Sequence, residues 1–451
     1  MLNYDECVAL KEFMACLDIK TECYLESNKT TRIRIRNNSI EDISKSSITG
    51  GQIRYYSNKQ RMKRIFSSPQ DIKKIYKDII HEEKYLGPYD KDKLDKNCLC
   101  KFIGEDLRID IDEIMTLLQS INKNILDLPQ IKGSLISYGS SLKTTVFLSS
   151  DGSVIMQQKK DIITNFAGIV DDGYKIITYP ISIGSGIGYD FLYDAQELII
   201  KPLLKMSTFS EKKNINSGDY PIILDPIVSG SLIHEVLGHL LEADNFFEYK
   251  ELLSELKIGE KIASSKLTVH DCPKIEGLRG SYYYDDEGEL SKDTILVKEG
   301  YLKSYMHSKD TAYKYNGEST GNARALNYRF APIVRMSNIY VEPGASTFDE
   351  MVANVKYGIL IKGLKGASTD IKKFTIIPRE SYLIENGRIS GRCKDVFLYG
   401  DIGILKNITM VGNKTEITQG YSCNKYSQRG LPVSYISPYF FIEKGHIEVI
   451  E

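Results

Sequence analysis

The sequence has no run of about eighteen consecutive apolar residues, and this absence argues against a membrane-spanning helix. It has no excess of charge of either sign, because 59 lysines and arginines nearly balance 60 aspartates and glutamates. It also lacks the basic stretch with interleaved aromatic residues that is typical of a nucleic-acid-binding protein. We therefore expect neither a membrane nor a nucleic acid as the partner, and a neutral molecule such as a peptide fits better.

Signals for export and for disulfide bonding are also missing. Residues 1–18 carry acidic side chains and have neither the basic segment nor the uninterrupted apolar segment of a secretory signal. The eight cysteines are scattered without a C-x-x-C pair, which favours reduced thiols over a disulfide framework. These absences predict a cytoplasmic protein. What is present, 42% apolar and 26% charged residues in 451 positions, is typical of a folded protein of two or three domains.

Helical and strand patterns alternate through the first 206 residues. Apolar spacing predicts helices at residues 4–17, 69–83, 111–125 and 190–206. Alternating polar and apolar residues predict strands at 22–26, 31–36, 52–56, 144–149 and 154–159, the last two joined by a turn at 150–152. Residues 84–97 are so highly charged that we expect an exposed loop. The first half is therefore predicted to be helices packed on an antiparallel sheet.

A change in composition near residue 210 predicts the domain boundary. Residues 207–219 are polar and rich in lysine, which is typical of a linker, so we expect an α/β domain at 1–208 and a second domain at 219–451. A strand at 220–224 and a type I′ turn at Asn386-Gly387 indicate that the second domain is mainly β, and the fold class is therefore α+β. The glycines at 184–188 lack the spacing of a phosphate-binding loop, and a flexible turn is the better interpretation.

The chemically informative segment is residues 231–244, which contains His234 and Glu235 followed by His239. Since the protein has only six histidines, this arrangement is not expected by chance. The two histidines are five residues apart, which on a regular helix leaves their side chains about 140° apart. A regular α-helix could not direct both imidazoles at one metal ion. We expect the backbone to widen into a π-type turn or to leave the helix near Gly238.

A glutamate directly after the first histidine is typical of zinc peptidases, where it takes a proton from the water that the metal activates and passes it to the leaving amine. Glu235 is therefore the predicted general base, and His234 and His239 are the predicted ligands. Glu242 and Asp244 could orient an imidazole or bind the metal themselves, and orientation is favoured for Glu242. The competing interpretation is a buried structural histidine beside a surface glutamate. The remaining histidines lack ligand-like spacing and are expected to be structural or surface residues: His81, His270, His307 and His446.

This segment resembles the active-site segment of the TldD/PmbA family of metallopeptidases, whose active members carry the same His-Glu-x-x-x-His pattern. Further stretches that look like the family follow in the same order, at 279–281, 285–288, 320–324, 332–338 and 382–387. A cysteine close to the C-terminus supplies the third metal ligand in this family, and Cys423 matches that place. The sequence departs from the family pattern at Asn424, where glycine is usual, and at Leu240 and Ala243. These departures concern the shape of the cleft and not the ligand set.

The resemblance implies a two-domain enzyme that binds one Zn²⁺ per chain through His234, His239 and Cys423. It also implies a homodimer, or a heterodimer with a related subunit. The implied activity is the cleavage of peptides or unfolded polypeptide segments, including leader removal from modified peptides. Four residues of the segment 320–338 are then expected to help form the substrate cleft: Asn322, Arg324, Arg335 and Asn338.

Two other functions compete with this interpretation. The first is a non-catalytic or regulatory subunit of a heterodimeric peptidase, in which the metal is only structural. The presence of Glu235 argues against it, because a structural site has no use for a general base. The second is a regulator of a nucleic-acid enzyme, which an older family name, modulator of DNA gyrase, suggests. The balanced charge gives that function no support.

Overall fold

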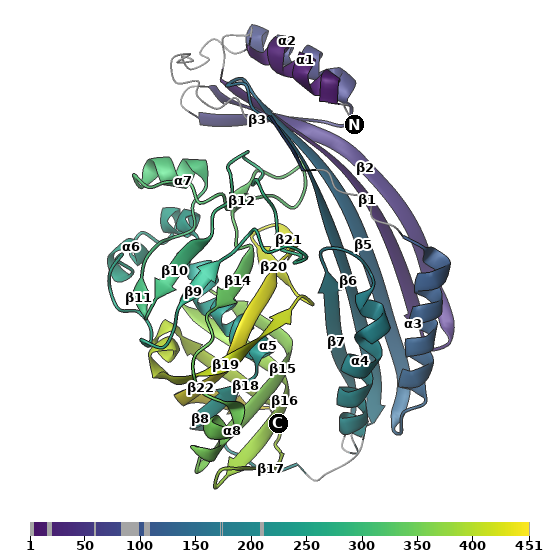
Figure 1. The fold of residues 1–451 in the computed structure, drawn as a ribbon, viewed down its shortest axis with the longest axis vertical. Helices are drawn as coiled ribbons and strands as arrows, with labels where there is room; N and C mark the ends of the chain where they lie inside the picture. The colour runs from purple at the N-terminus through teal and green to yellow at the C-terminus, as the bar shows by residue number, and fades with distance from the viewer. Residues whose placement is uncertain are drawn as a thin grey trace.

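The computed structural model describes residues 4–15, 20–57, 60–82, 99–102, 109–171, 173, 175–207 and 212–450. Two large sheets dominate the molecule, one formed by the first half of the chain and one by the second (Figure 1). The α+β fold that the sequence predicts is confirmed. None of the described helices is long and apolar enough to cross a membrane.

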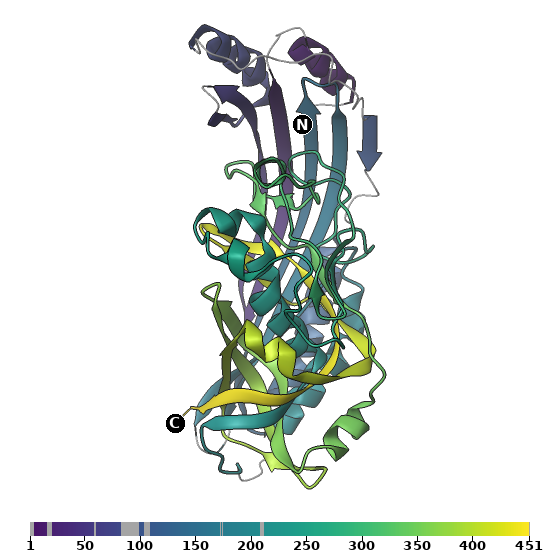
Figure 2. The ribbon, with the colours of Figure 1, turned by 90° about the vertical axis from the view of Figure 1, so that its left-hand side faces the viewer.

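The first sheet is built from long, curved strands, and within the described residues its order is β3-β2-β1-β5-β6-β4, with β7 beside β6. The bounds are β1 (Thr21–Arg36), β2 (Ser39–Ser57), β3 (Gln60–Phe66), β4 (Leu99–Phe102), β5 (Ile131–Ser149), β6 (Val154–Asp171) and β7 (Ile176–Ser185). Helices α1 (Tyr4–Ala15) and α2 (Ile72–Glu82), the latter preceded by a 3₁₀ turn at Pro69–Asp71, lie at one end of this sheet. Helices α3 (Ile111–Leu126) and α4 (Phe191–Ser207) pack along the other part. Figure 2 shows the end with α1 and α2 extending beyond the second half of the chain.

The alternation of side chains along β1 explains how the first sheet joins the two halves. Its odd-numbered residues, such as Cys23 and Ile33, are buried in the clusters under the helices. Near its start the even-numbered residues face the other half of the chain, where the Tyr24 hydroxyl donates to Asp286 Oδ1 at 3.2 Å, whereas Arg32, Arg34 and Arg36 near its end are exposed. Arg61 on β3 forms an ion pair with the neighbouring Glu287. The loop that contains Asp286 and Glu287 is therefore bound to the face of the first sheet that the helices do not cover.

The first half differs from the sequence prediction mainly in strand length. The predicted strands 22–26 and 31–36 are one strand, β1, and the predicted strands 52–56, 144–149 and 154–159 are parts of the longer β2, β5 and β6. The polar stretch of residues 27–30 suggested a break, but β1 is a central strand that pairs with β2 and β5 along its whole length, so ladder hydrogen bonds hold it extended. The four predicted helices are present, each within a few residues of its predicted ends. Residues 84–97 and part of the 207–219 linker lie outside the described residues.

The second sheet runs in the order β11-β10-β9-β14-β22-β18-β16-β15-β8, with β17 beside β16 and β19 beside β22. Strand β8 also pairs with β22, so β22, β18, β16, β15 and β8 close into a ring. The strands of this half are β8 (Gly218–Leu224), β9 (Val269–Asp271), β10 (Thr294–Lys298), β11 (Tyr301–Leu302), β12 (Ala323–Arg324), β13 (Ile333–Val334), β14 (Asn338–Val341), β15 (Tyr357–Thr369), β16 (Lys373–Glu385), β17 (Arg388–Arg392), β18 (Val396–Asp401), β19 (Ile408–Thr418), β20 (Ser422–Lys425), β21 (Gln428–Pro432) and β22 (Ser434–Val449). Its short helices are α5 (Pro226–Ile233), α6 (Leu252–Glu255), α7 (Lys309–Lys314) and α8 (Phe348–Ala353), with a 3₁₀ helix at Ile402–Asn407.

Helix α5 is apolar on every side, and such a helix is stable only when it is surrounded by the protein. It packs against strands on all sides, including β22, β15, β19, β14 and β8 (Figure 1). Asp225 caps its first turn by accepting a hydrogen bond from Val228 N at 2.9 Å. Gly230 is required here because a Cβ at this position would lie 2.7 Å from Tyr435 Cβ. The ring of strands therefore fixes the position of the segment that begins at His234.

The predicted type I′ turn at Asn386-Gly387 is confirmed. Both residues have positive φ angles, 48° and 73°, and they join β16 to β17 in an antiparallel pair. The predicted strand at 220–224 is also present, as β8. The mainly β character of the second half therefore follows from local turn and strand signals. The exact domain boundary stays a prediction.

Candidate metal centre

The five-residue spacing of His234 and His239 is accommodated by a widened turn. Helix α5 continues into a π-helix at His234–Gly238, which is followed by a 3₁₀ turn at His239–Leu241. The wider turn brings the two imidazole rings together, with their centroids 4.9 Å apart. The predicted π-type turn is confirmed, and it does what a regular α-helix could not do at this spacing.

Gly238 permits this turn because it packs directly against Met336. A Cβ at position 238 would lie 2.0 Å from Met336 Sδ, which is much shorter than any allowed contact. The φ of Gly238 is −57°, so the need for glycine is steric and does not come from an unusual dihedral angle. Close packing against the segment before β14 therefore fixes the end of the π-helix.

Cys423 joins the two histidines from a distant part of the chain. It lies on β20, which forms a hairpin with β21, and its Sγ is 3.5 Å from His239 Nε2 although 184 residues separate the two. One ligand atom from each of His234, His239 and Cys423 can be chosen so that all three lie within 4.8 Å of one another, and all three residues are buried. Arg335 Nη2 donates to the carbonyl oxygen of Cys423 at 2.7 Å, which holds the strand in place. The three residues that the sequence singled out as ligands are thus brought together by the fold.

Without a metal ion, the charges within this group favour a thiolate next to an imidazolium, whose proton a metal ion can replace. Burial favours the neutral thiol, but His239 and His234 beside it hold the pKa of Cys423 well below its usual value. Burial likewise opposes the charged imidazole, yet Cys423 and Glu242 hold the pKa of His239 well above its usual value. His234 Nδ1 is buried and has no hydrogen-bond partner among the described residues. A thiolate and two imidazoles, one of them with an unsatisfied nitrogen, form a donor set that fits Zn²⁺.

Glu242 lies on the side of His239 that faces away from Cys423. Its Oε2 is 3.0 Å from His239 Nδ1, and Lys425 Nζ is 3.0 Å from the same oxygen. Burial raises the pKa of Glu242, but Lys425 and His239 outweigh burial and lower it to about 2. Asp244 is the other partner of Lys425, at 2.6 Å from Nζ to Oδ1, and it also accepts from Val334 N. This arrangement places Glu242 where it orients the imidazole by accepting the Nδ1 proton.

Glu242→Gln is therefore expected to weaken metal binding by about 10–100-fold without removing a ligand, because the imidazole loses the charged acceptor that fixes its orientation. Competition with a chromophoric chelator measures this change. Complete loss of metal from the variant would instead favour Glu242 as a direct ligand, and unchanged affinity would remove it from the site altogether.

Glu235 opens onto the cavity beside the three ligands. The cavity has a volume of about 320 Å³, and its lining includes Glu235, His239, Glu242 and Cys423. The Glu235 side chain is partly buried. Burial raises the pKa of its carboxyl group above the usual value, although the neighbouring histidines oppose this shift. Residues 367–369 and 424–426 complete much of the wall. The carboxylate can therefore reach a molecule held in the cavity.

The four residues expected to form the substrate cleft do not line this cavity. They are all buried and bind mainly backbone groups of the protein. Arg324 donates to the carbonyl oxygens of Met336 and Pro432, at 2.5 Å and 2.9 Å. Asn322 donates to Asp271 Oδ2 at 2.7 Å, Asn338 donates to the Cys272 carbonyl at 2.8 Å, and the Arg335 contact to Cys423 is described above. They support the strands around the site, and their part in a substrate cleft stays a prediction.

Lys425 is a member of the site that the sequence analysis did not single out. It stands two residues after Cys423 on an extended strand, and this spacing places both side chains on the buried face. A buried lysine needs acidic partners, and Glu242 and Asp244 supply them. The spacing of Lys425 from Cys423 could have placed both side chains on one face of a strand. The acidic partners of Lys425 could not be predicted in this way, because only the fold brings Glu242 and Asp244 next to it.

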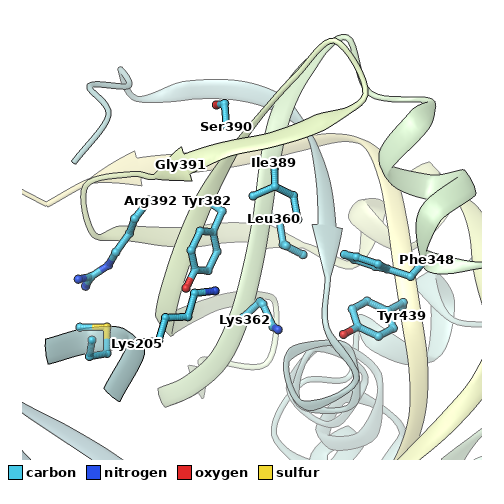
Figure 3. A pocket seen from close by; sticks show the side chains of 11 residues that line it. Lys205, Phe348, Leu360, Lys362, Tyr382, Ile389, Ser390, Gly391, Arg392 and Tyr439 are labelled. Carbon is cyan, nitrogen blue, oxygen red and sulfur yellow. The ribbon is translucent and has the colours of Figure 1, made fainter. Parts of the chain in front are cut away.

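A second cavity, of about 410 Å³, lies elsewhere in the molecule and shares no lining residue with the metal group (Figure 3). In Figure 3, Lys205, Tyr382 and Arg392 lie on one side of it, and Phe348 and Tyr439 on the other. It contains none of the three predicted metal ligands and no His or Cys side chain. Of these two cavities, only the one beside Glu235 is lined by predicted metal ligands, His239 and Cys423.

Comparison with known proteins places the chain in a family. Residues 217–448 match the PmbA/TldA metallopeptidase C-terminal domain, and residues 21–79 match PmbA/TldA metallopeptidase domain 1. The chain belongs to the TldD/PmbA family of metallopeptidases. It is 31% identical over 446 residues to a metalloprotease from Methanocaldococcus jannaschii, with 95% of this chain and 96% of the relative covered. A metalloprotease TldD homolog from Haemophilus influenzae is 32% identical over 319 residues, which cover 68% of this chain and 66% of that protein.

Solved structures of other proteins share the fold over nearly the whole length. TldE from Thermococcus kodakarensis has a TM-score of 0.76 at 18% identity, with 98% of this chain and 99% of that one covered. A protein from Thermotoga maritima, provisionally described as a modulator of a DNA gyrase, has a TM-score of 0.78 at 18% identity, with 98% of each chain covered. At this level of identity the likeness concerns the fold alone.

Proposed function

We propose that the chain is a zinc-dependent peptidase that cleaves peptides or unfolded polypeptide segments. The observation that carries the proposal is the convergence of His234, His239 and Cys423 in one buried group beside a cavity that Glu235 also lines. Membership of a metallopeptidase family and the names of the relatives, which are metalloproteases, support it. Location in the cytoplasm remains part of the proposal.

Each residue of the site has a distinct role in this mechanism. His234, His239 and Cys423 would hold one Zn²⁺, and the ion when bound supplies Lewis acidity that polarises a carbonyl and makes a water molecule acidic near neutral pH. Glu235 accepts the proton of the attacking water and passes it to the leaving amine. Glu242 accepts the Nδ1 proton of His239, so that Nε2, which faces Cys423, keeps its lone pair.

A purely structural metal is less consistent with the site. Structural zinc sites use four protein ligands and are closed, whereas the described residues bring three ligands together next to a cavity. Glu235 lines that cavity, and its side chain has no hydrogen-bond partner among the described residues that would give it a structural role. The non-catalytic alternative therefore leaves the position of Glu235 unexplained.

Removal and return of the metal test the proposal. We expect the purified protein to contain zinc and to cleave an unstructured reporter peptide. Treatment with a chelator should abolish cleavage, and one equivalent of Zn²⁺ should restore it. Cleavage that continues at the same rate after the metal has been removed, as verified by elemental analysis, would overturn the proposal.

We also propose that the chain works as a dimer, either with itself or with a related subunit. The family resemblance implies pairing, and edge strands such as β7 and β19, which pair with one strand each among the described residues, offer backbone groups that a partner can cover. Light scattering of the purified chain should give about twice the mass of one chain if it pairs with itself. A stable monomer that cleaves peptide at micromolar concentration would contradict this proposal.

A further inference from the structure

A second group of side chains that could hold a metal ion lies at the end of β9, outside the cavity beside Glu235. His270, Cys272 and Asp293 each offer a ligand atom, and these atoms lie within 4.8 Å of one another. His270 and Cys272 are two residues apart along an extended segment, so they point to the same face. Asp293 directly precedes β10, which pairs antiparallel with β9 at Thr294 and Asp271. The ladder between these two strands brings the carboxylate to the other two side chains.

Two of the three distances between ligand atoms are close to those of a tetrahedral zinc site. A single oxygen, Asp293 Oδ1, lies 3.2 Å from His270 Nδ1 and 3.1 Å from Cys272 Sγ. Ligand atoms around a tetrahedral zinc ion, bound at the usual lengths of about 2.0–2.3 Å, are roughly 3.3–3.6 Å apart. Both contacts of Asp293 Oδ1 are therefore within a few tenths of an ångström of the separations that an ion requires, and all three ligand atoms lie within 4.8 Å of one another. His270 and Cys272 are nearly buried, and Asp293 is 64% exposed, which gives an ion a path from solvent.

The second ring nitrogen of His270 faces the carboxylate of a glutamate, as one ring nitrogen of His239 does. Nε2 of His270 lies 3.0 Å from Glu342 Oε1, so both ring nitrogens face carboxylate oxygens. A neutral imidazole has one N–H and can satisfy only one of these contacts. If Nδ1 binds a metal ion, Nε2–H donates to Glu342 and both contacts are favourable. His239 likewise has a cysteine sulfur at one nitrogen and a glutamate at the other.

The local charge also favours a cation. Among the described residues, Asp293 and Glu342 form ion pairs with His270 only, and neither has a lysine or arginine partner. Asp271, between the two ligands, points to the opposite face, where it is fully buried and accepts from Ser337 N at 2.7 Å and from Asn322 Nδ2. These bonds hold the strand rigid, so His270 and Cys272 are positioned before a metal ion arrives.

We propose that His270, Cys272 and Asp293 bind a second transition-metal ion of the zinc class, with Glu342 orienting the imidazole. An imidazole, a thiolate and a carboxylate suit Zn²⁺ or Co²⁺ and do not suit Mg²⁺ or Ca²⁺, which prefer oxygen ligands alone. Binding releases the thiol proton of Cys272 to solvent. The proposal is independent of the peptidase function, because no residue is shared with the group at His234.

His446 provides a matched control. It too lies between two carboxylates, with Nδ1 2.9 Å from Asp219 and Nε2 3.1 Å from Glu448, but no thiol or other third donor completes a ligand group there within the described residues. If two carboxylates around a histidine were enough to bind metal, His446 would bind it as well. Cys272 is therefore the feature that distinguishes the group at His270 from the surroundings of His446.

Zinc content per chain, measured after equilibration with a small excess of Zn²⁺ and removal of free metal, tests the proposal. We expect two ions in the wild type, one in Cys272→Ser, one in Cys423→Ser and none in the double variant. His446→Gln and Cys393→Ser should keep two. Titration with Co²⁺ should show thiolate charge-transfer absorption that falls to about half in Cys272→Ser, because one of two thiolate ligands is lost.

Asp293→Asn provides a second variant, because its exposed side chain can be changed without opening the core. It should lower the affinity for the second ion at least tenfold, with unchanged thermal unfolding of the apoprotein. Equal zinc content in the wild type and Cys272→Ser, together with none in Cys423→Ser, would overturn the proposal and leave an imidazolium ion between two carboxylates. That result would leave the peptidase proposal standing. If zinc were lost only from Cys272→Ser and not from Cys423→Ser, the second site would be supported and the metal centre at His234 would be contradicted.

Discussion

Cys423→Ser is expected to lose both the zinc at His234 and His239 and the peptide cleavage that depends on it. A serine hydroxyl stays protonated near neutral pH, and it is a much weaker zinc ligand than a thiolate. The replacement also removes the sulfur that lies 3.5 Å from His239 Nε2. Zinc affinity from chelator competition and initial rates of peptide cleavage measure the two losses separately.

Cys393→Ser is the matched control for this change. Cys393 is also buried in the second half of the chain, but it belongs to neither ligand group among the described residues. Its substitution should leave zinc content and turnover at the wild-type level even if it lowers the stability. Should Cys423→Ser keep its zinc and its full activity, the third ligand is another group, and Glu242 is the first to examine.

Glu235→Gln is expected to keep the metal and the fold but to reduce turnover by at least about a hundredfold, the usual scale for the loss of a general base. The amide has nearly the same shape as the carboxylate and cannot accept the proton. Because Glu235 is not one of the three ligands, zinc content should not change. Steady-state kinetics with a reporter peptide, together with elemental analysis, separate the two effects.

A nearby carboxylate outside the cavity serves as the control. Glu251 is exposed on the surface, where it pairs with Lys372, so Glu251→Gln should cleave peptide at the wild-type rate. If Glu235→Gln hydrolyses peptide almost as fast as the wild type, the proton acceptor is a different group. Loss of zinc from the same variant would mean that Glu235 supports the metal rather than the proton transfer.

The local geometry at the histidines could be predicted from the sequence because it follows from a spacing. Five residues between His234 and His239 cannot place two imidazoles together on a regular α-helix, so the backbone had to depart from that form. The structure has a π-helix at these residues. The apolar character of residues 226–233 likewise requires a fully surrounded helix, although the closed ring of strands that surrounds it could not be foreseen.

The position of Cys423 could not be predicted from spacing, because 184 residues separate it from His239. Only the family resemblance selected it from eight cysteines. The same limit applies to the group around His270, which the sequence analysis expected to be a structural or surface residue. Its neighbour Cys272 is close in sequence, but Asp293 and Glu342 reach it only through the pairing of β9 with β10 and β14.

Strand lengths were underestimated for a different reason. Asn28 and Lys29 have low intrinsic preference for a strand, and the sequence analysis placed a break at positions 27–30. In the fold, β1 lies between β2 and β5, and hydrogen bonds on both sides hold it extended through this stretch. Pairing with distant strands therefore overrode the local signal.

The zinc X-ray absorption spectrum of the Cys272→Ser variant, loaded with one equivalent of Zn²⁺, tests most directly whether His234, His239 and Cys423 hold the ion. Removal of the Cys272 thiol leaves one proposed zinc site, so the spectrum reports a single environment. We predict one sulfur at about 2.3 Å and two imidazole nitrogens at about 2.0–2.1 Å in the first shell. A first shell without sulfur, or without imidazole nitrogens, would contradict the proposed metal centre.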